Sequence, residues 1–346
     1  MISVLVKTKM KLTHFFNRSE ENWNRTYVIA EIGINHEGSV DRCADLIRAS
    51  ANAGADAIKL QTVDAARCYA TDTESYKIFE KAMLTKSETA NMFQLANECG
   101  IEAFTTSGDP QTLKWVDKLN PVAHKISSGL LSCTPIVKEA CKLRKPILLS
   151  TGMSDILTID QTVDIVKQSG CTAALFQCTS LYPCPTEKLN LASINWLGSR
   201  YELPAGFSDH SFGVSMAPLA VAAGARLIEK HVTFDKRRSG FDHSISLERN
   251  EFAEMVSSIR QAEIAMGRPG KPVDPVIADQ EKNFERRLAA AQDLDAGHII
   301  GIDDILFMRF PKNVDAIASN KTENVINKKI NRPIRTGQAI KWQYLS

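Results

Sequence analysis

The sequence predicts an α/β protein, a (β/α)8 TIM barrel followed by a small β-rich domain. Three observations support this prediction. Short β-rich runs alternate with longer helical stretches eight times between residues 27 and 263, which is the order of a parallel barrel. The helical stretches 41–54 and 87–100 each close on a glycine, a common stop signal. The 346 residues exceed one barrel of roughly 250 residues.

The predicted strands are short apolar runs rich in β-branched residues. They are 27–33, 56–62, 101–107, 123–128, 146–152, 172–178, 204–210 and 226–232. A stretch crowded with Gly and Pro follows the last helix at 266–276 and predicts a boundary. The chain then divides into an N-terminal extension (1–26), a barrel domain (27–265), a linker (266–284) and a C-terminal module (285–346).

The C-terminal module contains a weak internal repeat. Leu294-x-x-Gly297-x-x-Ile300 recurs as Ile334-x-x-Gly337-x-x-Ile340. Together with its short apolar runs, this repeat predicts a small β-rich module.

Composition excludes several classes of protein. Apolar residues make up 44% and charged residues 24% of the chain, as in a globular protein in water. A formal charge of +2 does not favour nucleic acid or a membrane surface as partner, and no stretch approaches the roughly 20 apolar residues of a membrane span. The eight cysteines form no C-x-x-C pair and no export signal is evident, so we expect reduced thiols, a cytoplasmic location and no structural zinc site.

Polar side chains gather at the carboxyl ends of the predicted strands, where TIM barrels bind their ligands. Strand side chains alternate between two faces, so Glu229 shares a face with His231, and Ser208 with His210. Any one such residue is commonly structural, but their coincidence at one end favours a site. If these faces point to the barrel axis, one mouth collects Glu31, Lys59, Gln61, Lys125, His210 and His231.

This set of residues favours some chemistries over others. Two imidazoles on adjacent strands suit a divalent ion that binds substrate directly, such as Mn2+ or Zn2+, and two lysines with serines suit an anionic substrate. A hydrolase triad fits less well, because Asp209 and His210 lie on opposite faces of one strand and there is no G-x-S-x-G elbow. A metallohydrolase barrel would need more histidines on an early strand.

A set of ordered motifs spans the chain. They are AEIGINHEG (30–38), IKLQT (58–62), HKISSG (124–129), LSTGM (149–153), CTSLYP (178–183), GFSDHS (206–211), EKHVTF (229–234) and GFDHSISL (240–247). The chain resembles the sialic acid synthase family on these motifs. From RRLAAAQDLDAGHII (286–300) onward, it is similar to that family's C-terminal antifreeze-like SAF domain, for which an ice-binding role is the poorer interpretation.

The resemblance implies an activity and partners. These enzymes condense phosphoenolpyruvate with a six-carbon N-acylated amino sugar, an aldose, to give a nine-carbon 2-keto-3-deoxy acid and phosphate. Members form dimers in which the SAF domain of one subunit covers the active site of the other and offers an arginine. Arg309 is the candidate here, in a domain-swapped homodimer.

The resemblance also implies residue roles. His210 and His231 would hold a divalent cation, Mn2+ first and Mg2+ or Co2+ next, which polarises the aldehyde of the sugar. The phosphate and carboxylate of phosphoenolpyruvate would contact Lys59, Lys125, Ser107, Ser128 and Ser208. The sugar or the reacting centre would face Glu31, Gln61, Tyr182 and Asp242, with Ser180 in the place of an expected asparagine.

Several positions depart from the pattern of a bacterial N-acetylneuraminate synthase. Leu130 stands where an acidic residue would contact the sugar, Ser107-Gly108 replaces Thr-Pro, and Arg309 is followed by Phe-Pro-Lys in place of Pro-Gly. The condensing residues are therefore present while the sugar-reading residues differ. Alternative functions are a pseudaminic or legionaminic acid synthase acting on a di-N-acylated dideoxy sugar, a non-catalytic sugar-binding homologue, and a metal-dependent hydrolase.

Overall fold

The computed structural model describes residues 9–17, 25–271 and 274–346, and its contacts divide the chain into two units at Gly267/Arg268. In the first unit, eight parallel strands close into a barrel in chain order, β1 pairing with both β2 and β8. The strands are β1 (Tyr27–Gly33), β2 (Ala57–Thr62), β3 (Glu102–Ser107), β4 (His124–Ile126), β5 (Ile147–Ser150), β6 (Ala173–Cys178), β7 (Ala205–Asp209) and β8 (Leu227–His231). This confirms the predicted TIM barrel.

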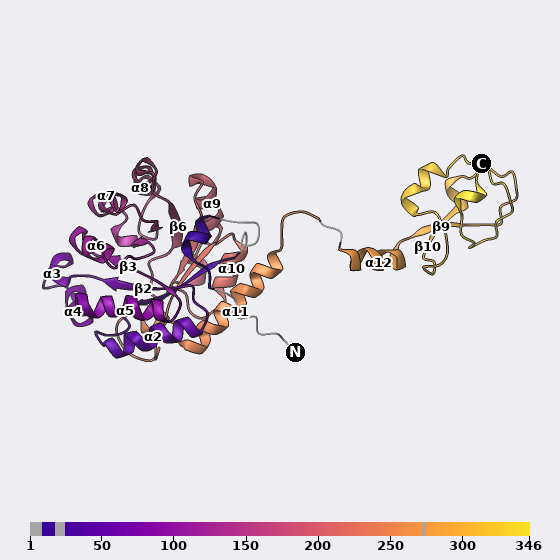
Figure 1. Cartoon of the computed structure of the whole chain (residues 1–346). Helices are drawn as coiled ribbons and strands as arrows, with labels where there is room; N and C mark the ends of the chain where they lie inside the picture. Colours follow the sequence, from indigo (N-terminus) through magenta and orange to yellow (C-terminus); the bar gives the residue numbers. More distant parts are fainter. Residues whose placement is uncertain (1–8, 18–24, 272–273) are drawn as a thin grey trace. The chain divides into compact units, whose positions relative to one another are not determined.

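Helices surround the strands (Figure 1). The helix that follows each strand and packs outside the barrel is, in order, α2 (Val40–Asn52), α5 (Lys86–Glu98), α6 (Pro110–Asp117), α7 (Thr134–Lys142), α8 (Ile156–Ser169), α9 (Ala192–Tyr201), α10 (Met216–Ala222) and α11 (Arg249–Met266). Two short helices, α3 (Ala65–Cys68) and α4 (Glu74–Ala82), extend the β2 loop at the carboxyl end of the barrel. Apolar side chains fill both the space between strands and helices and the barrel interior.

Local sequence signals set the helix ends. The Thr85 hydroxyl accepts from the Glu88 amide, and the Glu88 carboxylate accepts from the Thr85 amide, a capping box that begins α5. Gly54 and Gly100, the predicted stops, have φ of +95° and +70°, a conformation in which a side chain is strained.

The strand boundaries differ from the prediction by one or two residues at most ends. The largest differences are at β4 and β5, which each end two residues early; β4 ends at Ile126, while Ser128 begins a 3₁₀ turn, Ser128–Leu130. The extended Ser-Ser pair continues the strand pattern in sequence, but the ladder bonds to β5 stop at Ile126. His210 likewise lies one residue past the end of β7.

The N-terminal extension contributes a helix, α1 (Leu12–Phe16), to the amino end of the barrel. Phe15 is fully buried and packs with Tyr27, Phe104 and Phe176 of the barrel interior. The extension is therefore part of the barrel core.

The second unit begins with α12 (Pro275–Phe284), which lies inside the predicted linker. The prolines of the linker predict an irregular segment. Pro275, however, occupies the first helical position, where proline is tolerated, and Asp274 caps the helix by accepting from the Val276 amide at 2.8 Å. Strands β9 (Arg287–Ala290) and β10 (Ile305–Met308) then pair antiparallel.

The internal repeat of this unit has a structural counterpart. Leu294 and Ile334 exchange backbone hydrogen bonds at 2.8 and 2.9 Å. The Gly297 amide donates to the Ile330 carbonyl, and the Gly337 amide donates to the Ala290 carbonyl, at 2.7 and 2.8 Å. The two copies thus bond each other reciprocally around a shared core.

Two further predictions concern cysteines and membranes. All eight cysteines are free thiols. Among the described residues, no helix combines the length and apolar character that a bilayer crossing requires.

Candidate active site

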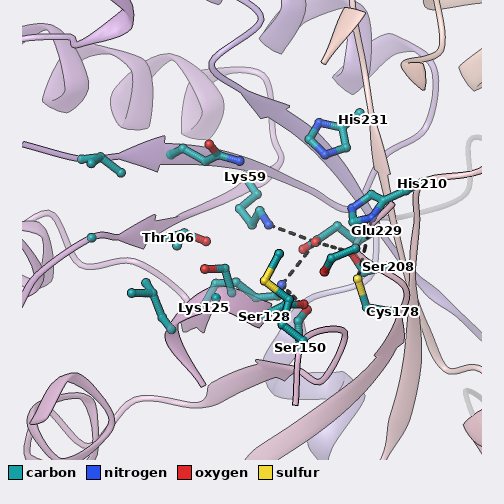
Figure 2. A pocket seen from close by; sticks show the side chains of 18 of the residues that line it. Lys59, Thr106, Lys125, Ser128, Ser150, Cys178, Ser208, His210, Glu229 and His231 are labelled. Atoms are coloured by element: carbon teal, nitrogen blue, oxygen red, sulfur yellow. Dashed lines mark hydrogen bonds and ion pairs between the residues drawn. The ribbon is translucent and has the colours of Figure 1, made fainter. Parts of the chain in front are cut away.

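A cavity of 430 Å3 opens at the carboxyl ends of the barrel strands. Its inner wall carries charged and imidazole side chains from β2, β4, β7 and β8 and from the residue after β7 (Figure 2). These are Lys59, Lys125, Ser208, Glu229, His231 and His210. Residues distant in the sequence therefore meet at one mouth, as the alternation of strand side chains predicts.

Glu229 is the centre of the charged group. Its Oε1 accepts from Lys59 Nζ at 2.9 Å, from Lys125 Nζ at 3.2 Å and from the Ser208 hydroxyl at 2.9 Å (Figure 2). Lys59 also forms an ion pair with Glu31, and Lys125 donates to the Ser150 hydroxyl at 2.6 Å. All of these charged groups are buried, so two ammonium and two carboxylate groups share one poorly solvated site.

Burial and these partners shift the ionisation of the group. Burial, opposed by the Glu229 carboxylate, lowers the pKa of Lys59 to about 7. Burial alone would raise the pKa of Glu229, but the ammonium groups of Lys125 and Lys59 outweigh it and lower that pKa. Glu229 is thus held as a carboxylate, and Lys59 is a cation that can release its proton near neutral pH.

Several buried polar atoms around this cavity have no hydrogen-bond partner among the residues that the structure describes. They are Thr106 Oγ1, Ser180 Oγ, Glu229 Oε2 and His231 Nδ1. Buried polar groups in proteins are hydrogen-bonded in about 90% of cases or more, and leaving one unsatisfied costs about 1–3 kcal/mol. Four such atoms at one cavity indicate that it receives a polar ligand.

The loops after β4, β5 and β6 pack closely together at the inner wall of the cavity. The Gly152 amide donates to the Ser128 hydroxyl at 3.1 Å. A Cβ at Gly152 would lie 2.8 Å from Ser180 Oγ, 2.9 Å from Ser128 Oγ and 3.0 Å from Cys178 Sγ. A glycine is therefore needed here to keep these polar atoms together at the cavity wall.

The two histidines converge at the inner wall. Their ring centroids lie 5.6 Å apart, and Tyr182 stacks on His210 at 4.1 Å. Burial, with the neighbouring His210, lowers the pKa of His231 well below its usual value, so its imidazole is neutral. His210 Nδ1 lies 3.0 Å from the Thr179 carbonyl oxygen; if it donates there, its other ring nitrogen is free to bind a ligand.

The loop after β8 places Asp242 beside this pair, with Oδ2 3.8 Å from His231 Nδ1. Asn35 fixes the loop by accepting from the Asp242 amide at 3.1 Å and donating to the Val232 carbonyl at 2.9 Å. Glu37 fixes the same loop by accepting two hydrogen bonds from Arg238. The GINHEG segment after β1 is therefore a support for the β8 loop.

The outer half of the cavity is apolar. Val63, Tyr69 and Phe79 come from the β2 loop and its two short helices, while Leu130 and Met153 come from the loops after β4 and β5. The cavity thus has a charged inner end and an apolar outer end, which suits a ligand with the same division.

Comparison with known proteins identifies the family. Residues 46–271 match the NeuB family and residues 285–345 match the SAF domain. The chain belongs to the NeuB family. It is therefore an enzyme, a carbon–carbon bond-forming transferase, and its second unit contains the SAF domain.

Individual NeuB relatives differ in the product they are named for. The chain is 29% identical to the N,N'-diacetyllegionaminic acid synthase of Legionella pneumophila, over 92% of this chain and 94% of that protein. It is 31% identical to a pseudaminic acid synthase of Campylobacter jejuni, over 92% and 96%. The crystal structure of an N-acetylneuraminic acid synthetase from Leptospira borgpetersenii superposes with a TM-score of 0.72 at 29% identity, covering 74% and 90% of the two chains.

The structure brings most of the predicted site residues of this NeuB chain together. Those that line the cavity are Lys59, Gln61, Lys125, Ser128, Ser180, Tyr182, Ser208, His210 and His231. Glu31 lies directly behind them and contacts Lys59 and Gln61. Arg309 belongs to the SAF domain, where its guanidinium lies 5.1 Å from the centre of the Phe284 ring.

Ser107 does not line the cavity. Thr106 does, because it pairs in register with Gln61 and Lys125 and so shares their face. Ser107 pairs with Thr62 and shares the opposite face, toward the helices. The Thr-Pro position of the family pattern pointed to the neighbouring residue, and only the register between β2 and β3 selects Thr106.

Other cavity residues were not among the predicted site residues. Glu229, Thr106, Ser150 and Cys178 all line the cavity. Glu229 could have been found, because it shares the face of His231 on the period of two. Cys178 gives no such signal in the sequence; its thiol lies 3.8 Å from His210 Nδ1.

The side chains around His210 and His231 are the donor set for the implied metal ion. Among the residues that the structure describes, no three His, Cys, Asp or Glu side chains are grouped to hold a metal. Two converging imidazoles, one neutral with an unsatisfied buried nitrogen, nevertheless suit an ion whose remaining positions are taken by substrate and water. The residues therefore fit a weakly held, substrate-binding cation and do not fit a structural metal.

Proposed function

We propose that this chain condenses phosphoenolpyruvate with a six-carbon N-acylated amino sugar to give a nine-carbon 2-keto-3-deoxy acid and phosphate. The observation that carries the proposal is the set of buried polar atoms without partners around Lys59, Lys125 and Glu229. A small ligand rich in oxygen and negative charge would satisfy them.

Phosphoenolpyruvate fits the inner end of the cavity. Lys59 and Lys125 supply two cations for its phosphate and carboxylate, and hydroxyl donors of Thr106, Ser128 and Ser208 lie on the same wall. Within this group the two carboxylates, Glu31 and Glu229, already balance the two lysines. An anion of two or three charges therefore needs further positive charge, for which the proposed metal and Arg309 are the candidates.

His210 and His231 would hold a divalent cation, Mn2+ first, at the inner wall. When bound, the cation would act as a Lewis acid on the aldehyde of the sugar. In the reaction, C3 of phosphoenolpyruvate forms a bond to the aldehyde carbon, water adds to C2, and the C–O bond to phosphate breaks. Glu31 is the candidate to accept or relay the proton of that water, since it lies beside Lys59 at the inner end.

The apolar outer end favours one class of acceptor. Leu130, Met153 and Phe79 would face the end of the sugar remote from the aldehyde. We propose that this end carries an acylamino or deoxy group, as in the di-N-acylated dideoxy sugars that give legionaminic or pseudaminic acid. N-acetylmannosamine, with its hydroxylated end, would find fewer hydrogen-bond partners there.

The direct test measures phosphate release by purified protein with phosphoenolpyruvate, Mn2+ and a panel of acceptors, and identifies the product by mass spectrometry. We expect phosphate in proportion to a nine-carbon product, fastest with a di-N-acylated sugar. A Lys125→Met variant is the matched control for contaminating phosphatase. Folded protein that releases no phosphate with any acceptor of the panel would overturn the proposal.

The proposal extends to assembly and location. We propose a homodimer in which the SAF domain of one subunit supplies Arg309 to the site of the other, because the charge balance above calls for a further cation. Analytical ultracentrifugation tests for the dimer. Restored activity when the Arg309→Ala and Lys125→Met variants are mixed would show that Arg309 is supplied from one subunit to the site of the other, and not within one subunit. A cytoplasmic location stays a prediction.

A further inference from the structure

Two residues of the conspicuous motifs take no part in the cavity. Asp209 stands in GFSDHS and Lys230 in EKHVTF, and each directly precedes one of the two histidines. Because strand side chains alternate, both point away from the barrel axis, toward the helices. They are 1% and 0% exposed, so a full ion pair is buried immediately behind the imidazoles.

The pair holds the backbone that follows His210. Lys230 Nζ donates to Asp209 Oδ2 at 3.0 Å and to the Ser211 carbonyl at 2.5 Å. Asp209 Oδ1 in turn accepts from the Ser211 amide at 2.8 Å and from its hydroxyl at 2.6 Å. Three charge-assisted contacts therefore converge on Ser211.

These contacts lie at the end of the β7–β8 ladder, beyond which no sheet hydrogen bonds of the described residues hold this part of the chain. The ladder between β7 and β8 ends at the Asp209–Lys230 pair, and His210 is the next residue. Its carbonyl accepts from the Cys184 amide at 2.9 Å, on the side of the β6 loop. On the side of β8, the Asp209–Lys230–Ser211 network takes the place of ladder bonds.

The energetics point away from a purely stabilising role. A buried ion pair gains little over apolar side chains of the same volume, because desolvation offsets the attraction. A buried ion pair instead fixes the positions of the groups around it, since only a few positions satisfy each charge. We infer that Asp209 and Lys230 are positioning residues that hold the His210 imidazole against that of His231 for the cation. The inference rests on the proposed metal-binding role of the two histidines.

The test measures the affinity for Mn2+ alone, by electron paramagnetic resonance titration, alongside thermal unfolding. The variants are Asp209→Asn, Lys230→Met and the double variant. Each single change leaves one buried charge alone and should lower the unfolding temperature, whereas the double variant removes both charges and should recover much of it. We expect the double variant still to bind Mn2+ about 10- to 100-fold more weakly than the wild type, and Lys230→Arg to retain the wild-type affinity.

A matched control lies at the opposite end of the barrel, where Arg260 pairs with the buried Asp56 at 3.1 Å. The double change Asp56→Asn with Arg260→Met should alter stability and leave the affinity for Mn2+ unchanged. If the Asp209→Asn/Lys230→Met protein binds Mn2+ as the wild type does, the positioning role is overturned.

A milder variant keeps the test decisive if the double variant does not fold. Ser211→Ala removes one of the converging contacts and leaves the charges paired, and we expect a smaller loss of Mn2+ affinity with normal unfolding. Unchanged affinity there overturns the inference. Wild-type protein that binds no Mn2+ overturns both the inference and the metal role, while phosphate release by that protein would leave the proposed condensation intact.

Discussion

The two ends of the barrel differ in the surroundings of their buried polar groups. At the amino end, the Asp56 carboxylate accepts from the amides of Met10 and Val28 at 2.8 and 3.0 Å, and Glu102 accepts from the Leu12 amide and the Tyr27 hydroxyl, both at 2.7 Å. At the carboxyl end, buried atoms of Thr106, Ser180, Glu229 and His231 have no hydrogen-bond partner among the described residues and belong to residues that line the cavity. The atoms without such a partner at the amino end, on Arg25, Thr26 and His124, lie away from that cavity.

The buried carboxylates at the amino end therefore have a structural role, whereas the unsatisfied polar atoms of the cavity are available to a ligand. The satisfied carboxylates at the amino end join the N-terminal extension to the barrel, which contributes to stability. The unsatisfied atoms at the other end lower stability until a ligand completes them, the usual relation between a preorganised site and the stability of a fold. Substitutions at the two ends should therefore change different quantities.

The largest effect is expected from His231→Ala at the carboxyl end. Loss of one of two imidazoles should weaken metal retention and lower kcat/KM by about 10³-fold or more, several kcal/mol of transition-state stabilisation. Because His231 Nδ1 has no hydrogen-bond partner in the described part of the chain, the unfolding temperature should change little. Phosphate release and thermal unfolding measured on the same preparation check both parts. Wild-type activity that persists after chelation of divalent metal would contradict the reasoning.

The converse effect is expected from Phe15→Ala at the amino end. Phe15 is fully buried in the barrel interior, and truncating a buried phenylalanine costs about 3–5 kcal/mol. Denaturant unfolding should show this loss, while kcat and KM of the folded protein stay at wild-type values. A lowered kcat without lost stability would show that the two ends are not independent.

The ionisation of Lys59 connects stability and function within the carboxyl end. Its pKa of about 7 means that the cation needed for an anionic substrate is lost as the pH rises through neutrality, so kcat/KM for phosphoenolpyruvate should fall about tenfold per pH unit above 7. Between a pH of about 7 and the ordinary lysine pKa of 10.5, the folded state binds fewer protons than the unfolded chain, so the contribution of Lys59 to the free energy of unfolding rises with pH.

Lys59→Arg is the control for this pH dependence, because the guanidinium stays charged over the whole range. The alkaline fall in kcat/KM should be absent in that variant, although its absolute activity will be lower. An identical fall in both proteins would assign the ionisation to another group.

The sequence was sufficient for the barrel, since alternation of strands and helices depends on local periodicity. The glycine stops separated the helices from the strands. The alternation of strand side chains then predicted that Lys59, Lys125, His210 and His231 lie at one mouth of the barrel, as they do. Two features depended on tertiary structure. The role of α1 in the core could not be seen, because Phe15 has no periodic context, and α12 was missed because Pro275 suggests a break unless its capping partner Asp274 is recognised.

Within the site, long-range pairing decided what local pattern could not. Thr106 rather than Ser107 faces the cavity because of its register with Gln61. The central place of Glu229 results from two lysines on other strands reaching the same oxygen. Such convergence requires the closed barrel, which a linear pattern does not contain.

The smallest effect is expected at Leu130, in the apolar outer wall, and it concerns the choice between acceptor sugars. A glutamate there would offer a charged acceptor to sugar hydroxyls, worth about 1.5–3 kcal/mol per hydrogen bond when made. Leu130→Glu should therefore raise the ratio of kcat/KM for N-acetylmannosamine over a di-N-acylated dideoxy sugar by about tenfold. Leu130→Met, which keeps volume and polarity, should leave the ratio unchanged. If both variants keep the wild-type ratio, Leu130 only packs against the core and the acceptor is selected elsewhere on the wall, with Met153 and Phe79 the next positions to exchange.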